Sequence, residues 1–219
     1  MRDFLKESMF LYQADNLAGG GDGRFTFTLI NGGTAYAVTG LCEEQKEVFI
    51  PASYNGLPVT QINPRAFAGK EQLLHVVMPS SVEVVGDSAF CRCCNLQTVQ
   101  FSDNIVRLGE GVFSECPALT SVKLPERLTY TGGYVFYRCS GLQRVIIPKN
   151  IAGIGYKSFE GCDCLQEVFY EGSAEDWRWV RVQSNDVLLR AKMYYYSESA
   201  PLEAGNYWRF GVNGEPMIW

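Results

Sequence analysis

The sequence predicts a solenoid of stacked leucine-rich repeats, because identical residues recur in columns every 23 positions. The most regular column is aromatic and consists of Phe67, Phe90, Phe113, Phe136 and Phe159. Leucine, valine, glycine and cysteine columns keep the same step and begin at Leu73, Val76, Gly86 and Cys93. A constant period in the 20–29 residue range with short apolar strands is typical of this architecture. Because one unit cannot bury its own apolar side, we expect the units to stack on their neighbours.

Residues 86–108 form a regular unit of this pattern. Its strand spans 96–101, and the two-residue alternation of a strand turns Val99 inward and Thr98 and Gln100 outward. The expected product is an α/β-type right-handed superhelix of mostly β strands with short helical turns.

The other half of the unit carries the buried aromatic. After a second apolar segment at Ile105 and Leu108 comes a glycine turn, and then one helical turn that presents the Phe column. Asp87 or Ser88 is placed to cap that helical turn. Burying each phenylalanine stabilises the fold by roughly 2–3 kcal/mol.

Residues 1–23 are expected to form an N-terminal lead and a Gly-rich linker, with the glycines at 19–21 and 23. A phosphate-binding loop would need a following Gly-Lys-Ser/Thr at the start of a helix. Arg24-Phe25-Thr26 begins a strand instead, so a linker is favoured.

Residues 24–61 are predicted to be an N-terminal capping hairpin followed by an irregular first repeat. Apolar and polar residues alternate on both sides of Asn31-Gly32, which is a strong hairpin signal. The first repeat has its strand at 48–51, and its five extra residues fall within 52–58, which we expect to be a loop. Regular repeats then occupy 62–170.

Residues 171–219 are predicted to be an aromatic-rich C-terminal cap, so that β-hairpin caps lie at both ends. Ser173 to Asp176 resembles a capping box, which predicts a short helix through Trp177 and Trp179. A strand is expected at 193–196, and a hairpin from Tyr207 to Ile218 turning at 213–214. The aromatics of this segment could instead form a sugar-stacking platform, although an uncovered solenoid end would favour aggregation.

The repeats resemble the BspA-like leucine-rich repeats of bacteria and some protozoa. The recurring form x-I-G-x-x-A-F-x-x-C-x-x-L-x-x-V-x-I-P is seen here as 85–90 followed by Cys93, Leu96 and Val99. The resemblance extends to the tail at 170–173 with Trp177, at 194–197 and at 206–208, and covers about residues 24–219. It implies an exported surface protein of a host-associated microbe with a role in adhesion and protein binding. The family has no shared catalytic residues.

Composition excludes several classes of function. The chain of 219 residues carries 19 basic and 24 acidic side chains, a net charge of −5, which argues against nucleic acid as a partner. No stretch has the 18 or more apolar residues of a membrane-spanning helix, so membrane insertion is not expected. The N-terminus is a poor secretory signal. As written the chain is expected to be cytoplasmic, or at the cell surface if it is a fragment of a longer protein.

Eight cysteines raise the alternatives of metal, disulfide and free thiol. Four belong to the 23-residue column, where small thiols pack inside a repeat as buried free cysteines do. The other four could form a disulfide and are Cys42, Cys91, Cys94 and Cys164. None of the spacings is the paired C-x-x-C of a zinc site. Buried free thiols are favoured, and neither a metal nor a cofactor is expected.

The candidate binding site is the row of outward side chains on the stacked strands, since solenoids bind through such extended surfaces. The residues proposed for partner binding are His75, Thr98, Gln100, Ser121, Lys123, Arg144, Ile146, Glu167 and Phe169. Exposed Ile146 and Phe169 beside the two basic residues would suit a protein partner. The alternative is a merely solvated face with the C-terminal cap folded over Phe169. His75 is the only histidine and has no catalytic partner.

The sequence thus predicts a monomeric, non-enzymatic protein-interaction or adhesion module. Carbohydrate or cell-envelope binding through the C-terminal aromatic segment is the alternative.

Overall fold

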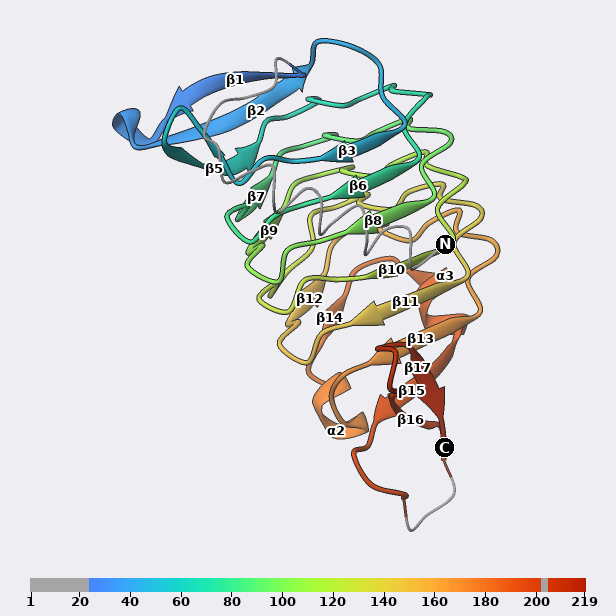
Figure 1. Cartoon of the computed structure of the whole chain (residues 1–219). Helices are drawn as coiled ribbons and strands as arrows, with labels where there is room; N and C mark the ends of the chain where they lie inside the picture. The colour runs from blue at the N-terminus through green and yellow to red at the C-terminus, as the bar shows by residue number, and fades with distance from the viewer. Residues whose placement is uncertain (1–23, 202–204) are drawn as a thin grey trace.

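The computed structural model describes residues 24–201 and 205–219 and shows a β-solenoid of about seven turns (Figure 1). The predicted N-terminal lead and linker lie outside these residues. The strands of the N-terminal half are β1 Phe25–Ile30, β2 Ala35–Leu41, β3 Glu47–Phe49, β4 Ser53–Tyr54, β5 Leu57–Ile62, β6 His75–Val77, β7 Val84–Val85, β8 Thr98–Gln100 and β9 Arg107–Leu108. Those of the C-terminal half are β10 Ser121–Lys123, β11 Arg144–Ile147, β12 Gly153–Ile154, β13 Glu167–Tyr170, β14 Arg181–Val182, β15 Lys192–Tyr196, β16 Tyr207–Phe210 and β17 Pro216–Ile218. The helical segments are η1 Asn31–Gly33, α2 Ala174–Trp177 and α3 Asp186–Arg190.

Two rows of parallel strands run along the stack. The first, which we call the sheet face, contains β3-β6-β8 and then β10-β11-β13-β15, continued by β16 and β17. The second, the flank, contains β2-β5-β7-β9 and then β12-β14. Paired residues on β6 and β8, and on β11 and β13, are 23 positions apart, as His75 with Thr98 and Arg144 with Glu167. The repeat period therefore sets the register of the sheets. None of the helices in the described ranges is long and apolar enough to cross a membrane.

The phenylalanine column forms a continuous stack through the core. All five rings are fully buried. Successive centroids lie 4.9, 5.3, 5.7 and 5.3 Å apart, and the planes are within 27° of parallel. Each ring thus packs against the same ring of the neighbouring repeats, which confirms the predicted origin of the core.

The segment that presents each phenylalanine is not the predicted helical turn. The residues two places before and two places after the ring, such as Ser88 and Arg92 around Phe90, have positive φ of 55° and 61°. The amide hydrogens of Ser88, Phe90 and Arg92 are donated to carbonyls of the next repeat rather than within a helix. Asp87 likewise accepts the Glu110 amide hydrogen at 3.0 Å and does not cap its own turn. Hydrogen bonding between repeats therefore replaces the helix.

The cysteine column consists of free, buried thiols, as predicted. Each Sγ donates to the carbonyl of the phenylalanine 26 residues earlier, for example Cys93 to Phe67 at 3.1 Å. Burial raises the pKa of Cys93 and of Cys139 to about 12, and raises the pKa of Cys116 and Cys162 as well. The four off-column cysteines are also free. The column thus acts as a set of neutral hydrogen-bond donors.

The N-terminal cap is the predicted hairpin of β1 and β2, and β2 pairs in parallel with β5. The segment 52–58 is not the expected loop. It folds into a tight β4-β5 hairpin, in which the central residues Asn55 and Gly56 have φ of 48° and 78°. Positive φ at both central residues is what a type I′ turn requires, and Asn-Gly is its preferred sequence.

The C-terminal cap closes the other end, but the helix predicted through Trp177 and Trp179 is shorter than expected, since α2 ends at Trp177. Ser173 makes both hydrogen bonds of a capping box with Asp176 at the start of α2. Helix α3, which the sequence did not predict, follows Asn185. The strand β15 extends the sheet in parallel with β13, and β16 and β17 form the expected antiparallel hairpin. Trp208 is fully buried and its Nε1 donates to the carbonyl of Tyr170 at 2.9 Å. Stacking on the last repeat is therefore the role of this aromatic residue.

Candidate functional site on the sheet face

A cavity of about 800 Å³ opens on the sheet face, and we call it the sheet groove. Strands β8, β10 and β11 form its floor, and the turn between β16 and β17 forms one wall with residues 213–215. Six of the nine residues proposed for partner binding line it, and they are Thr98, Gln100, Ser121, Lys123, Arg144 and Ile146. The three that do not line it are His75, Glu167 and Phe169.

The groove lies where the sheet face is interrupted. Strands β8 and β10 belong to neighbouring repeats, yet no β-ladder joins them among the described residues, and the sheet divides there into two. At this interruption Val99 and Phe101 are only half-buried, whereas Val76 and Val122, which share the column of Val99, are buried. Apolar side chains that the other repeats hide are thus accessible from the groove.

Lys123 lies in a network of acidic groups. Its Nζ is 3.0 Å from Glu126 Oε1 and 3.3 Å from Glu171 Oε1, and it stands 5.1 Å from the ring centroid of Phe210. Burial lowers the pKa of Lys123, whereas the hydrogen bonds and charges of the two glutamates raise it. Together the glutamates outweigh burial, so the pKa lies above its usual value. Burial raises the pKa of Glu171, and the lysine partly opposes this. Lys123 is thus a charged residue whose charge is already compensated.

Arg144 is compensated in the same way. Its guanidinium donates to Glu167 Oε2 from both Nε at 3.0 Å and Nη2 at 2.7 Å. Its Nη1 lies 3.9 Å from Glu215 Oε2 in the β16–β17 turn. Arg144 therefore links the repeat strands to the C-terminal hairpin.

The expectation of exposed apolar residues at Ile146 and Phe169 was wrong. Ile146 is 8% exposed and Phe169 is 1% exposed. The ring of Phe169 stacks on Tyr194 with centroids 4.9 Å apart, and Trp208 approaches it edge-on at 5.3 Å. The C-terminal cap covers both residues, as in the alternative of a sheet face with the cap folded over Phe169.

His75 and Glu167 make local hydrogen bonds instead of lining the groove. His75 Nδ1 is 2.8 Å from Thr98 Oγ1 on the next strand.

The sequence interpretation missed two parts of the groove. Val99 and Phe101 were expected to face inward by the strand alternation, but they are only half-buried and line the groove. The residues of the β16–β17 turn were not expected there at all. Their position depends on the cap folding back along the sheet face, and only the Asn213-Gly214 turn itself was visible in the sequence.

Comparison with known proteins identifies the repeat type. A family model described as the BspA type leucine rich repeat region matches residues 60–178 with six copies. Among curated proteins, no sequence matches the chain.

Solved structures share the fold. A leucine rich repeat protein of T. pallidum is 28% identical, with a TM-score of 0.66, over 69% of this chain and 71% of that one. A leucine rich cell surface protein of Faecalibacterium prausnitzii is 32% identical, also with a TM-score of 0.66, over 74% of this chain and 41% of its own length. The pneumococcal vaccine antigen PcpA is 16% identical, with a TM-score of 0.54, and shows the fold alone. The family match spans more than half of the length of this chain, and the chain therefore belongs to the BspA-type leucine-rich repeat family.

Proposed function

We propose that this protein is a non-enzymatic binding module that holds a protein partner in the sheet groove. Proteins with leucine-rich repeats are generally protein-interaction scaffolds and typically not enzymes. The observation that carries the proposal is the interruption between β8 and β10, because it makes Val99 and Phe101 accessible beside hydrogen-bonding side chains. A partly apolar cavity with a few polar groups is the usual composition of a binding pocket.

The charges around the groove point to a partner segment with a basic residue beside an apolar anchor. The groove lining carries two cations, Lys123 and Arg144, and two carboxylates, Asp103 and Glu215. Glu126 and Glu171 pair with Lys123, and Glu167 pairs with Arg144, from outside the lining. The excess of acidic groups favours a cationic partner, since complementary potentials steer association and select partners.

We further propose an adhesion role at a cell surface. The support is the similarity to the F. prausnitzii protein, which is described as a cell surface protein. The chain covers less than half of that protein, so the role of the rest of such a molecule is not carried over.

The test is capture of partners from extracellular host proteins and bacterial proteins with the full chain and two variants. Ser121→Arg places a large cation in the groove from an exposed strand position. Ser80→Arg is the matched control, because Ser80 is also exposed and does not line the groove. Each captured protein is then purified and its affinity measured for all three chains.

We expect Ser121→Arg to weaken the binding of a specific partner at least about tenfold, which corresponds to about 1.4 kcal/mol, and Ser80→Arg to leave it unchanged. Chemical cross-linking should then place that partner within reach of Lys123. If both variants bind every captured protein as the unmodified chain does, the sheet groove is not the binding site.

A further inference from the structure

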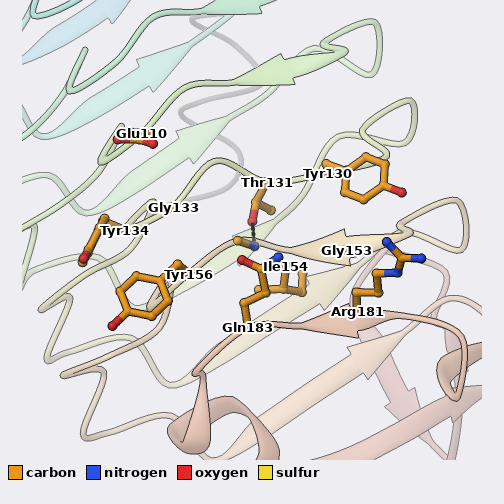
Figure 2. A pocket seen from close by; sticks show the side chains of 11 residues that line it. Glu110, Tyr130, Thr131, Gly133, Tyr134, Gly153, Ile154, Tyr156, Arg181 and Gln183 are labelled. Carbon is orange, nitrogen blue, oxygen red and sulfur yellow. Dashed lines mark hydrogen bonds between the residues drawn. The ribbon is translucent and has the colours of Figure 1, made fainter.

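A second cavity, of about 400 Å³, lies on the flank of the stack and shares no residue with the sheet groove. We call it the flank pocket. Figure 2 shows its lining side chains, with Tyr130 and Arg181 at one end and Tyr134 and Tyr156 at the other. Its volume falls within the range of about 300–1,000 Å³ typical of small-ligand pockets.

Two glycines that line the pocket stand in columns that carry side chains in the adjacent repeats. Gly133 stands between Glu110 and Tyr156, which are 23 residues before and after it. Its added Cβ would lie 3.3 Å from the Tyr156 carbonyl oxygen. A side chain here would therefore press against the backbone of Tyr156, a residue that lines the pocket.

Gly153, in the neighbouring column, makes room for an aromatic ring of the pocket. It pairs with Tyr130 on one side and with Arg181 on the other. A Cβ on Gly153 would lie 2.8 and 2.9 Å from two atoms of the Tyr130 ring. The glycine thus allows this ring to lie against the backbone of the next repeat.

Three tyrosines line the pocket with much of their surface in solvent. Tyr130, Tyr134 and Tyr156 are 56%, 37% and 44% exposed, and they are the only tyrosines among the exposed large apolar side chains of the described residues. Tyr134 and Tyr156 meet edge to face with centroids 5.6 Å apart, which fixes their orientation. Clustered exposed aromatics are uncommon on a protein surface without a binding role.

Hydrogen-bond donors and acceptors lie among the tyrosine rings. Glu110 offers carboxylate acceptors, Arg181 offers guanidinium donors and Gln183 offers both. Neither Glu110 nor Arg181 forms an ion pair with any residue that the structure describes. The Thr131 hydroxyl between them is already engaged, because it accepts the Gly155 amide hydrogen at 2.9 Å (Figure 2).

We propose that the flank pocket binds a neutral saccharide. The C–H groups on one face of a sugar ring pack against the negative face of an aromatic ring. Sugar hydroxyls both donate and accept, so they require the donors and acceptors that Arg181, Gln183 and Glu110 supply together.

The lining carries one acid, Glu110, and one base, Arg181. Lys157, whose Nζ lies 5.6 Å from the centroid of the Tyr156 ring, is paired with Glu160 at 3.8 Å. The charges around the pocket therefore balance, which favours a neutral sugar over an acidic one. The rings are too few and the cavity too small for the broad contact of a folded protein partner, whose interface side buries about 800 Å².

The test begins with the full chain on an array of neutral and acidic oligosaccharides. The free form of the best-binding oligosaccharide is then titrated by calorimetry into the unmodified chain and into Tyr130→Ala and Tyr156→Ala. Trp179→Ala is the matched control, because Trp179 is an aromatic of the C-terminal segment that is 86% exposed and outside the pocket. As a readout that needs no variant, amide shifts of Thr131, Gly133 and Gly155 are followed by NMR during the titration.

We expect each tyrosine substitution to weaken binding of a neutral oligosaccharide about tenfold or more, and Trp179→Ala to have no effect. The three amides should shift as the sugar is added. Ser121→Arg should leave the sugar affinity unchanged, so that this proposal and the sheet-groove proposal fail separately.

Four results would overturn the proposal. The first is the absence of binding to any sugar on the array, and the second is binding confined to acidic sugars. The third is loss of sugar binding in Trp179→Ala but not in the tyrosine variants. The fourth is that the pocket binds a protein and no sugar, and that Tyr156→Ala abolishes the binding of that protein. Loss of binding in Trp179→Ala alone would place the sugar site at the C-terminal aromatics.

Discussion

The side-chain oxygen of Asn185 accepts the amide hydrogen of Phe159 at 2.8 Å, in the place where each earlier phenylalanine of the column bonds to a backbone carbonyl of the next repeat. The amide nitrogen of Asn185 donates to the carbonyls of Gly155 and Gln183 at 2.9 and 2.7 Å. Asn185 is 1% exposed. The Asn185 side chain therefore supplies the hydrogen-bond acceptor that a further repeat would offer to Phe159.

Asn185→Asp should destabilise the protein by about 2–4 kcal/mol, because it buries a carboxylate that cannot donate to the carbonyls of Gly155 and Gln183. Urea unfolding measures the change. Asn95→Asp is the control, since Asn95 is exposed and donates to a single carbonyl, that of Glu71 at 2.9 Å. Equal effects of the two substitutions would show that Asn185 has no special part in closing the stack.

Phe113→Ala should cost about 3–5 kcal/mol, because it opens a cavity in the middle of the aromatic stack. Phe113 is fully buried and contacts the rings of Phe90, Phe136 and Phe101. The free energy of unfolding is again the measurement. A loss below about 1 kcal/mol would mean that neighbouring repeats close over the gap without penalty.

The four column thiols should resist alkylation in the folded protein. They are fully buried and burial raises the pKa of each, so little thiolate is present to react. Thiol titration should detect the exposed Cys42, Cys94 and Cys164 quickly and the half-buried Cys91 more slowly. All eight should react in denaturant. Rapid reaction of more than four without denaturant would contradict the buried column.

Stability should fall as the pH rises from about 9 towards 12. Burial raises the pKa of Cys93 and Cys139 from 9.0 to about 12, so the unfolded thiols ionise first and pull the equilibrium towards the unfolded state. Below the unfolded pKa both states are protonated and this effect is absent. Urea midpoints measured across this range should decline less steeply in Cys93→Ala/Cys139→Ala than in the unmodified chain. Identical slopes would assign the alkaline loss to other groups.

Removal of residues 173–219 should cause aggregation, because it uncovers Phe169 and Tyr170, which are 1% exposed in the full chain. It also leaves the edge of β13 without its partner β15. Light scattering compares the truncated chain with the full one, which we expect to be monomeric. A soluble, monomeric truncation would show that the last repeat needs no cover.

The sequence predicted what depends on local or periodic signals. The Phe and Cys columns, the hairpin at Asn31-Gly32 and the capping box at Ser173 were all found in the expected places. These features are visible because each is repeated, or is completed within a few residues.

The failures concern interactions between segments. Tyr134 and Lys157 have φ of 57° and 51° although neither is glycine. Their amide hydrogens are donated to Tyr156 of the next repeat and to Gln183 of the C-terminal cap, and these bonds hold the backbone there. The burial of Phe169 depends on Trp208, 39 residues later. The flank pocket did leave a signal, since Gly133 and Gly153 break columns that are otherwise filled.

The interruption between β8 and β10 has a mechanical consequence for a molecule loaded along its length. The two repeats remain joined by the hydrogen bonds of Ser88, Phe90 and Arg92 and by the bridge from Leu108 to Thr131. Tension is thus carried past this joint by the turns and the flank, because no β-ladder among the described residues joins β8 to β10.

We expect the solenoid to extend first at this joint when it is pulled from its ends. Single-molecule pulling would show this as an initial lengthening. A disulfide introduced between Thr98 and Ser121 should suppress that lengthening. Lengthening at this joint would change the shape of the sheet groove, so that force along the solenoid would alter the partner binding that we propose there.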